Sequence, residues 1–477
     1  MNLYIHNHAY HYEMENLTRA FFFGEEVKVL HETAALKEPF ILTSVTDEVR
    51  VEVSTGGFHD ALSAPLSDDD ELTMGRLLYR LLSRACTREL PWGILTGVRP
   101  IKLFSHLAGQ DGVEAAASYF RDTLYVSEPK IALARSVAQN QRAIIARSGA
   151  KSFSLYVSIP FCPTRCSYCS FVSQSIEKAK GLIEQYLPLL LSELQYTADL
   201  AQRLGLRLLS VYVGGGTPTT LSAEQLDLLL GEICADFDLS ECTEFTVEAG
   251  RPDTVTREKL LALKRHGVTR ISINPQTFND AVLERIGRRH TAQQTVDAYR
   301  LARELCFDNI NMDLIAGLTG DTPDSFRATI DTVRALDPES VTVHTLAVKR
   351  SARLNAADAL AEHGYTAGML DYAARELTAG GYQPYYLYRQ SSMLSNLENI
   401  GWAKPGFFSP YNIYIMEETH SILACGAGAV TKLRDCSSNH LERIFNFKYP
   451  YEYVSRFDEL IARKERIGMF YREYNLS

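Results

Sequence analysis

The chain has 477 residues, long enough for a barrel-sized domain and one or two smaller domains. Its 46% hydrophobic and 22% charged residues are ordinary globular usage, which excludes disordered, collagen-like and coiled-coil proteins. The net charge of -9 argues against nucleic acid or an anionic membrane as a partner. The N-terminus lacks the pattern of a secretory signal, and no apolar run reaches the roughly 18 residues of a membrane span, so we expect a cytoplasmic protein.

Residues 1–150 are predicted to form an N-terminal accessory domain. Short apolar runs occur at residues 27–30 and 49–53, and a helical stretch covers residues 72–86. Ala-rich helical spacing continues over residues 113–148. Ser148-Gly149-Ala150 ends this spacing, so we place the first domain boundary there.

From residue 153 the pattern changes to short β-rich runs separated by longer helical segments, which is typical of βα units and a parallel sheet. Six strands are predicted, at residues 155–159, 210–213, 244–247, 270–273, 309–314 and 340–345. The helices between them include residues 176–203, 223–237, 257–266, 293–305 and 323–336. We therefore expect an α/β core over residues 151–380, with a sheet that curls without closing and chemistry at the carboxyl ends of its strands. Residues 381–477 are predicted to form a C-terminal α+β region.

Three of the nine cysteines, Cys162, Cys166 and Cys169, form a C-x3-C-x2-C loop directly after the first predicted strand. The others are interpreted as ordinary reduced thiols, since they have no ligand spacing: Cys86, Cys234, Cys242, Cys306, Cys425 and Cys436. Three thiolates so close together can hold one metal centre. An iron–sulfur cubane with one open iron fits three thiolates better than a structural zinc, which would need a distant fourth ligand.

A glycine-rich segment, residues 214–218 (GGGTP), ends the second predicted strand. Glycines there allow the backbone to approach a ligand closely, although three glycines alone more often form a tight turn. Its place one βα unit after the cysteine loop favours a binding role.

The cysteine loop after the first strand resembles that of the radical S-adenosylmethionine (SAM) superfamily. This resemblance implies a partial (β/α)6 barrel, which agrees with the six units predicted independently. It also implies a [4Fe–4S] cluster whose open iron binds SAM through its amino and carboxylate groups. In that superfamily the reduced cluster cleaves the C–S bond of SAM to give methionine and a 5′-deoxyadenosyl radical, and the glycine-rich segment holds the SAM amino group.

Five further segments resemble the oxygen-independent coproporphyrinogen III oxidases in the same order: residues 155–162, 214–218, 247–249, 275–279 and 311–318. Residues 91–100 and 396–406 are similar to the longer coproporphyrinogen dehydrogenase (Z-type) branch of that family. The resemblance implies anaerobic oxidative decarboxylation of coproporphyrinogen III to protoporphyrinogen IX in heme biosynthesis. It further implies a reducing electron donor such as flavodoxin or ferredoxin, and a C-terminal region that covers the tetrapyrrole substrate.

By position, the resemblance implies that the three loop cysteines hold the cluster. Residues expected to contact the SAM at the cluster are Tyr156, Gly215, Glu248 and Val430. Positions that match a second SAM site are Tyr168, Gly216, Thr217, Gln276, Arg288, Asp313 and Ala347. Glu248, at a strand end, is suited to accept hydrogen bonds from a ribose diol or an ammonium. Asp313 and Arg288 could instead form a structural ion pair.

Tyr156, Glu248 and Arg165 are the candidate catalytic residues. The substrate carries four propionates and needs cationic anchors, and Arg165 lies inside the cysteine loop. Further candidate anchors are Arg99, Lys102, Lys349, Arg350 and Lys404.

Two positions depart from the family pattern and keep alternatives open. The oxidases have an additional cysteine where this chain has Phe171, as heme-chaperone relatives do. Those chaperones carry an H-N-x-x-Y-W segment where this chain has residues 411–416 (YNIYIM). The alternatives are a heme chaperone that keeps the cluster, and another radical SAM reaction on a tetrapyrrole such as methylation or ring opening.

Overall fold

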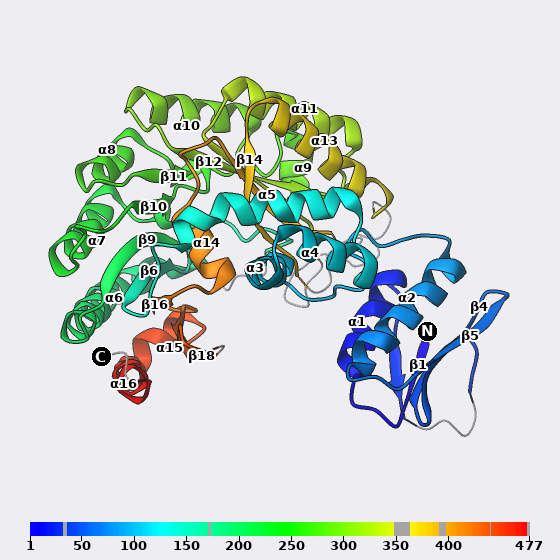
Figure 1. Cartoon of the computed structure of the whole chain (residues 1–477). Coiled ribbons are helices and arrows are strands. Elements are labelled where there is room, and N and C mark those ends of the chain that lie inside the picture. Colours follow the sequence, from blue (N-terminus) through cyan, green and yellow to red (C-terminus); the bar gives the residue numbers. More distant parts are fainter. Residues whose placement is uncertain (32–35, 170–172, 348–362, 391–396, 439, 475–477) are drawn as a thin grey trace. The chain divides into compact units, whose positions relative to one another are not determined.

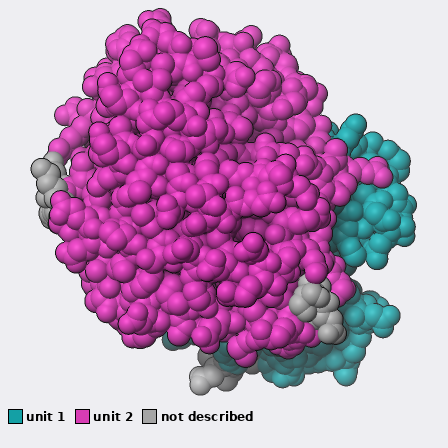
Figure 2. All heavy atoms as spheres, turned by 90° about the vertical axis from the view of Figure 1, so that its left-hand side faces the viewer, with its two compact units in different colours: residues 1–139, 355–367, 387–399 teal, residues 140–354, 368–386, 400–477 magenta. Residues whose placement is uncertain are grey.

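The computed structural model describes residues 1–31, 36–169, 173–347, 363–390, 397–438 and 440–474. The chain divides into two compact units, each built from three stretches of sequence. Unit 1 contains residues 1–139, 355–367 and 387–399, and unit 2 contains residues 140–354, 368–386 and 400–477 (Figure 2). Domain boundaries at residues 150 and 380 remain a prediction.

Unit 1 contains a five-stranded sheet with the order β2-β1-β3-β4-β5. Its strands are β1 (Asn2–His6), β2 (Lys28–Leu30), β3 (Phe40–Val45), β4 (Glu48–Thr55) and β5 (Phe58–Pro65). The helices of this part of the chain are α1 (His11–Phe21), α2 (Asp70–Cys86), α3 (Pro100–Asp111), α4 (Val113–Ser118), the π-helical η1 (Tyr119–Thr123) and α5 (Glu128–Ile145). Val49, Val51 and Val53 alternate along β4 and are fully buried in a core that also contains Leu78 and Leu82 of α2.

The second sheet has eleven strands in the order β14-β15-β13-β12-β11-β10-β9-β6-β16-β17-β18 and lies almost wholly in unit 2. Its six central strands are parallel and follow one another along the chain: β6 (Ser152–Ile159), β9 (Arg207–Gly215), β10 (Glu244–Glu248), β11 (Arg270–Ser272), β12 (Ile310–Ala316) and β13 (Ser340–Thr345). The six predicted strands are confirmed, and so is the partial (β/α)6 fold.

Helices connect these strands and lie along the outer side of the sheet (Figure 1). They are α6 (Ile176–Arg203), α7 (Ala223–Asp236), α8 (Arg257–Arg265), α9 (Asp280–Arg285), α10 (Ala292–Glu304) and α11 (Pro323–Leu336). Side-chain caps fix several of their starts: Ser222 and Thr291 form capping boxes at α7 and α10. No helix within the described residues is long and apolar enough to cross a membrane.

The C-terminal region adds strands to both edges of the parallel sheet. Its elements are α13 (Thr366–Ala379), β14 (Gln383–Tyr388), β15 (Asn399–Ala403), α14 (Pro410–Glu417), β16 (Ser421–Cys425), β17 (Val430–Arg434), β18 (Leu441–Phe445), α15 (Pro450–Ser455) and α16 (Phe457–Glu473). Strand β15 pairs antiparallel with β13, whereas β16 pairs parallel with β6. Because β16 runs in the same direction as β6, the turn after β16 lies at the edge where the cysteine loop begins.

Candidate active site

The cysteine loop leaves the carboxyl end of β6 and is fixed by hydrogen bonds on both sides. Residues 161–162 form the short strand β7 (Phe161–Cys162), which pairs with β8 (Gln174–Ser175). Ser167 N donates to Ile286 O at 3.0 Å, and Thr164 Oγ1 donates to Gly287 O at 2.8 Å. All three cysteines are in the reduced form; Cys166 is buried, and the other two are half-buried. They are therefore available as ligands from one short loop.

The glycine-rich segment packs directly against this loop. Gly216 N donates to Ile159 O at 2.8 Å, and Thr217 N donates to Phe161 O at 2.7 Å. A Cβ atom at Gly216 would lie 2.6 Å from Phe161 O and 3.0 Å from Cys162 Sγ, so the close approach requires glycine. The Thr217 hydroxyl lies 3.6 Å from the same sulfur. The two motifs are therefore neighbours at the carboxyl ends of β6 and β9.

A [4Fe–4S] cluster fits this donor set. In such a cluster each cysteine binds a different iron, so the sulfurs need not converge on one point. Within the described part of the chain, no group of three or more His, Cys, Asp or Glu side chains converges to hold a single metal ion. The three reduced cysteines and the glycine segment packed closely beside Cys162 match a cluster held by three cysteines.

Glu248 ends β10 and lies against a stack of tyrosine rings. Tyr212 of β9 donates its hydroxyl to Glu248 Oε1 at 2.6 Å. Its ring stacks on Tyr411 of α14 at 4.4 Å between centroids, and the Tyr156 ring lies 6.3 Å from both. Burial raises the pKa of Glu248 to about 7, and it also raises the pKa of Tyr156 well above its usual value. Sequence reasoning missed Tyr212 and Tyr411, because buried tyrosines in a Tyr-rich chain carry no signal of their own.

Ser158, also missed, joins Tyr156 and Gly215 to the C-terminal region. Its hydroxyl donates to Ala427 O at 2.8 Å and would lie 2.8 Å from a Cβ at Gly215, which has a φ of 106°. It also hydrogen-bonds Tyr156. Ala427 belongs to the turn after β16, and this turn leads to Val430 at the start of β17. The structure thus brings the predicted contacts Tyr156, Gly215 and Val430 to one edge of the sheet.

The other predicted SAM contacts follow the next strands. Gln276, after β11, has a φ of 69°, and its N–H donates to Asp313 O of β12 at 2.9 Å. Asp313 accepts from Asn311 Nδ2 at 2.7 Å and faces His344 at 3.9 Å. Burial would raise the pKa of Asp313, but hydrogen bonds from His344, Asn311 and Thr342 lower it. Ala347 follows β13 and is half-buried.

Arg288 has partners other than Asp313. Its Nη1 donates to Asn274 O at 2.6 Å, and the guanidinium also contacts Tyr168 and Cys166. The pKa of Arg288 is raised, since Tyr168 and Cys166 outweigh the effect of burial, and burial raises the pKa of Tyr168. The alternative of an Arg288–Asp313 ion pair is not the arrangement observed among the described residues. Arg288 instead lies beside the cysteine loop.

A second buried guanidinium beside the cysteine loop, that of Arg251, was not predicted. Arg251 is 3% exposed, and its Nη1 lies 3.7 Å from Cys166 Sγ. It also donates to Thr164 Oγ1 from both terminal nitrogens, at 3.2 and 3.1 Å. A single Arg after a strand-end motif is usually a surface residue, so the sequence held no signal for it.

The basic residues proposed as substrate anchors lie in different places. Arg165 lies in the cysteine loop, half-buried, with its carbonyl next to Gly287. Lys404 forms an ion pair with Asp337 at 2.8 Å, before β13, and therefore lies at the amino-terminal edge of the sheet, away from the motifs. Arg99 and Lys102 belong to unit 1. Lys349, Arg350 and the Phe171 position lie outside the described residues.

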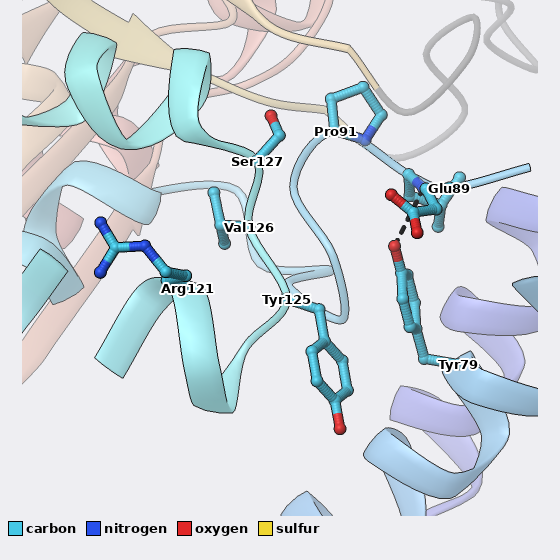
Figure 3. A pocket seen from close by; sticks show the side chains of 8 residues that line it. Tyr79, Glu89, Pro91, Arg121, Tyr125, Val126 and Ser127 are labelled. Carbon is cyan, nitrogen blue, oxygen red and sulfur yellow. Dashed lines mark hydrogen bonds between the residues drawn. The ribbon is translucent and has the colours of Figure 1, made fainter. Parts of the chain in front are cut away.

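A cavity of about 440 Å³ in unit 1 contains none of the predicted site residues (Figure 3). Its wall includes the stacked rings of Tyr79 and Tyr125, whose centroids are 5.3 Å apart. The Tyr79 hydroxyl accepts a hydrogen bond from Leu90 N at 3.2 Å. The described residues predicted to hold the cluster and SAM belong instead to unit 2.

A partial (β/α)6 sheet, with three cysteines after its first strand and a glycine segment after its second, defines the class of radical SAM proteins. The Radical SAM superfamily model matches residues 156–333. The chain is 36% identical over 484 residues to the oxygen-independent coproporphyrinogen-III oxidase-like protein HemZ of Bacillus subtilis (strain 168), with 96% of each chain covered. The chain belongs to this HemZ family of radical SAM proteins, and membership implies a [4Fe–4S] cluster and SAM as cofactors.

Two further comparisons cover less of the chain. The heme chaperone HemW of Bacillus subtilis (strain 168) is 39% identical over 197 residues, which are 41% of this chain and 51% of the chaperone. The structure of coproporphyrinogen III oxidase (HemN) from Escherichia coli, described as a radical SAM enzyme, has a TM-score of 0.51 at 24% identity. The match covers 68% of this chain and 72% of that chain. The last comparison supports the fold.

Proposed function

We propose that this protein is an oxygen-independent coproporphyrinogen III oxidase. It would convert two propionates of coproporphyrinogen III to vinyls, with release of CO2, and give protoporphyrinogen IX. The observation that carries the proposal is the 36% identity, over 96% of both chains, to a protein named for its likeness to those oxidases. The cysteine loop and Glu248, brought to one edge of the sheet, support it.

In this proposal Cys162, Cys166 and Cys169 hold the cluster. When bound, the cluster and SAM supply a 5′-deoxyadenosyl radical, a species able to take a β-hydrogen from a propionate. Glu248 accepts hydrogen bonds from the ribose diol, and Tyr212 orients its carboxylate. Gly215, Tyr156 and Val430 line the same site, while Tyr168, Gly216, Thr217, Gln276, Arg288, Asp313 and Ala347 form the proposed second SAM site.

In this reaction two of the four propionates become vinyl groups, and each conversion follows the same steps. After loss of the β-hydrogen, the propionate loses CO2 and one electron to an external acceptor. A donor such as flavodoxin or ferredoxin provides the electron that each SAM cleavage consumes. Arg165 orients a propionate carboxylate, because a planar guanidinium in the cysteine loop can bind it through two parallel hydrogen bonds.

Arg165→Ala should therefore uncouple the two halves of the reaction. We expect SAM cleavage to remain close to wild type while vinyl formation falls by at least about tenfold, the effect of roughly 1.4 kcal/mol in the barrier. Lys404→Ala is the matched control, because Lys404 is paired with Asp337 at the opposite edge of the sheet. Equal vinyl formation in the two variants would remove Arg165 from the proposed role.

The decisive experiment for the function is anaerobic reconstitution followed by incubation with SAM, a reductant and coproporphyrinogen III. Mass analysis of the porphyrins should show two successive losses that correspond to decarboxylation. A fully loaded protein that cleaves SAM but releases no CO2 would contradict the proposal.

A heme chaperone is the second candidate, supported by the 39% identity to HemW over 197 residues. A chaperone would bind heme tightly and pass it to an apo-protein without changing its mass. Stoichiometric heme binding with no turnover of coproporphyrinogen III would favour this function. A product heavier by a methyl group, or an opened ring, would instead indicate another radical SAM reaction on a tetrapyrrole.

A further inference from the structure

Arg251 is a buried cation in contact with the cysteine loop. It follows Glu248 by a short loop at the carboxyl end of β10 and is 3% exposed. Its Nη1 lies 3.7 Å from Cys166 Sγ, and both terminal nitrogens donate to Thr164 Oγ1. The guanidinium therefore reaches both the middle cysteine and the residue two positions before it.

Asp253 pairs with one side of the Arg251 guanidinium, and the other side faces the Cys166 sulfur. Asp253 accepts from Arg251 Nε at 3.1 Å and from Nη2 at 3.3 Å, and its side chain is 21% exposed. His290 also lies near these charged side chains. Its pKa is lowered to about 3 by burial and by Arg288 and Arg251, so its imidazole is neutral. Arg288 brings another positive charge to Cys166. Two guanidinium groups thus flank one cysteine, with one carboxylate nearby.

A buried charge costs free energy unless opposite charge and hydrogen bonds offset that cost. A cluster held by three thiolates carries negative charge, and one-electron reduction adds one more. A cation that touches a ligand sulfur therefore stabilises the reduced form more than the oxidised form. Hydrogen bonds to ligand sulfurs and nearby net charge are among the factors that set cluster potentials.

We propose that Arg251 raises the reduction potential of the cluster through its contact with Cys166 and so makes one-electron reduction by the donor easier. This inference rests on the proposed function in one respect, namely that Cys166 is a cluster ligand. Arg251 would then be a positioning residue that adjusts the reduction potential of the cluster, and it is not among the predicted SAM or substrate contacts.

Arg251 also holds the loop in place through Thr164, so the two roles need separate variants. Arg251→Gln removes the charge, while Arg251→Lys keeps the charge and loses the planar fork. Asp253→Asn keeps Arg251 and removes the carboxylate that partly neutralises it. The matched control is Arg257→Gln on α8, where an exposed arginine is paired with Glu304 at 2.7 Å.

The experiment is an anaerobic redox titration of the reconstituted full chain, followed by the electron paramagnetic resonance signal of the reduced cluster, without SAM or substrate. Arg251→Gln should shift the midpoint potential to a more negative value. Arg251→Lys should stay nearer to wild type, and Asp253→Asn should shift the potential in the opposite direction. Arg257→Gln should leave it unchanged, since its charge is screened by solvent.

Three results would overturn the inference. They are an unchanged potential in both Arg251→Gln and Asp253→Asn, equal shifts in Arg251→Lys and Arg251→Gln, or an equal shift in Arg257→Gln. If Arg251→Gln retains no cluster, the direction of the Asp253→Asn shift decides, because that variant keeps the arginine.

Cys166→Ser separates this inference from the proposed function. If Cys166→Ser loses the cluster while Arg251→Gln titrates as wild type, only the role of Arg251 fails. If Cys166→Ser keeps its iron and its signal, the ligand assignment fails, and the role of Arg251 fails with it.

Discussion

At Glu248, burial raises the pKa of the carboxyl to about 7, and the nearby Asp313 acts in the same direction. The Tyr212 hydroxyl acts in the opposite direction, because it donates to the ionised carboxylate. The group therefore changes charge near neutral pH, where an ordinary glutamate is fully ionised. Above pH 7 the ionised form offers two acceptor oxygens to a ribose diol; below pH 7 the protonated form is the weaker acceptor.

SAM affinity should accordingly weaken as the pH falls through about 7, and Glu248→Gln should remove this pH dependence. The variant should retain its iron and lose about 1–3 kcal/mol of SAM binding at pH 8, the cost of a lost charged hydrogen bond. Equilibrium binding of SAM at several pH values measures both effects. Glu241→Gln is the control, because this exposed carboxylate is paired with Arg207 at the surface. A pH profile that survives in Glu248→Gln would assign the titration to another group.

Gly216 marks the closest approach between the glycine segment and the cysteine loop. Gly216→Ala would place a Cβ 2.6 Å from Phe161 O and 3.0 Å from Cys162 Sγ, so the loop must move. We expect iron content after reconstitution to fall to less than about half, with a stability loss of about 1–3 kcal/mol from overpacking. Gly181→Ala on α6 has open space at the new Cβ and should keep its iron. A fully loaded Gly216→Ala protein would show that the close approach is not required.

Spacing made part of the site predictable from sequence. Three cysteines within one loop and three consecutive glycines after a strand are local patterns, and both were located correctly. Arg251 and Tyr411 acquire their roles only through contacts between segments far apart in the chain, and no spacing pattern in the sequence marks those contacts. Lys404 was predicted as a substrate anchor but lies away from the site. Its side chain is at the amino-terminal edge of the sheet, because β15 runs antiparallel to β13.

At the scale of elements, a buried ion pair between Lys464 and Glu193 connects α16 to α6. Lys464 Nζ lies 3.0 Å from Glu193 Oε1 and also donates to Ala424 O at 2.9 Å. The same carboxylate accepts from Gly426 N at 2.7 Å and from Tyr453 OH at 2.6 Å. Both charged side chains are at most 1% exposed. The pair thus fixes the turn after β16, and through it the surroundings of Val430.

Lys464→Met should destabilise unit 2, because it leaves the Glu193 carboxylate buried without its cation. The expected loss is about 3–5 kcal/mol in the free energy of unfolding, measured by denaturant titration. The double variant Glu193→Gln with Lys464→Met should recover part of this loss, since no buried charge remains. Arg466→Met on the same helix, an exposed partner of Glu442, should change stability by less than about 1 kcal/mol. Equal effects of the two helix variants would contradict the argument.

The parallel strands were predictable because strands buried on both faces appear as short apolar runs between amphipathic helices. Residues 152–155 and 157–159 of β6, which include side chains on both faces, are buried, and the predicted strand begins within this run. The pairing of β16 with β6 was not predictable, because a parallel partner is chosen by tertiary contacts across more than half of the chain. Short helices such as α9 (Asp280–Arg285) also escape detection, since six residues are too few for a clear period.

At the scale of the whole molecule, unit 1 includes residues 387–399, which are far along the sequence from residues 1–139. Trp92 Nε1 donates to Glu398 Oε2 at 2.7 Å, and Lys130 pairs with the other oxygen of this fully buried carboxylate. Arg389 Nη1 donates to Leu95 O at 2.5 Å. Trp92 and Glu398, which lie in the two segments that resemble the Z-type branch, are therefore bonded to each other within unit 1.

The two tryptophans of the chain allow the units to be followed separately. Trp92 belongs to unit 1 and Trp402 to unit 2, and both are buried. Glu398→Gln removes the charge that faces Lys130 and weakens the bond to Trp92. It should therefore lower the stability of unit 1 by about 1–3 kcal/mol.

In a Trp402→Phe background, urea unfolding followed by Trp92 fluorescence should move to lower denaturant when Glu398→Gln is added. In a Trp92→Phe background, the transition reported by Trp402 should stay in place, because β13, which pairs with the strand of Trp402, contains none of the altered contacts. Unit 1 has its own core, built from residues between Leu3 and Leu90, and this core is the reason to expect separate transitions. Equal shifts of both signals would mean that the two units unfold as one cooperative body.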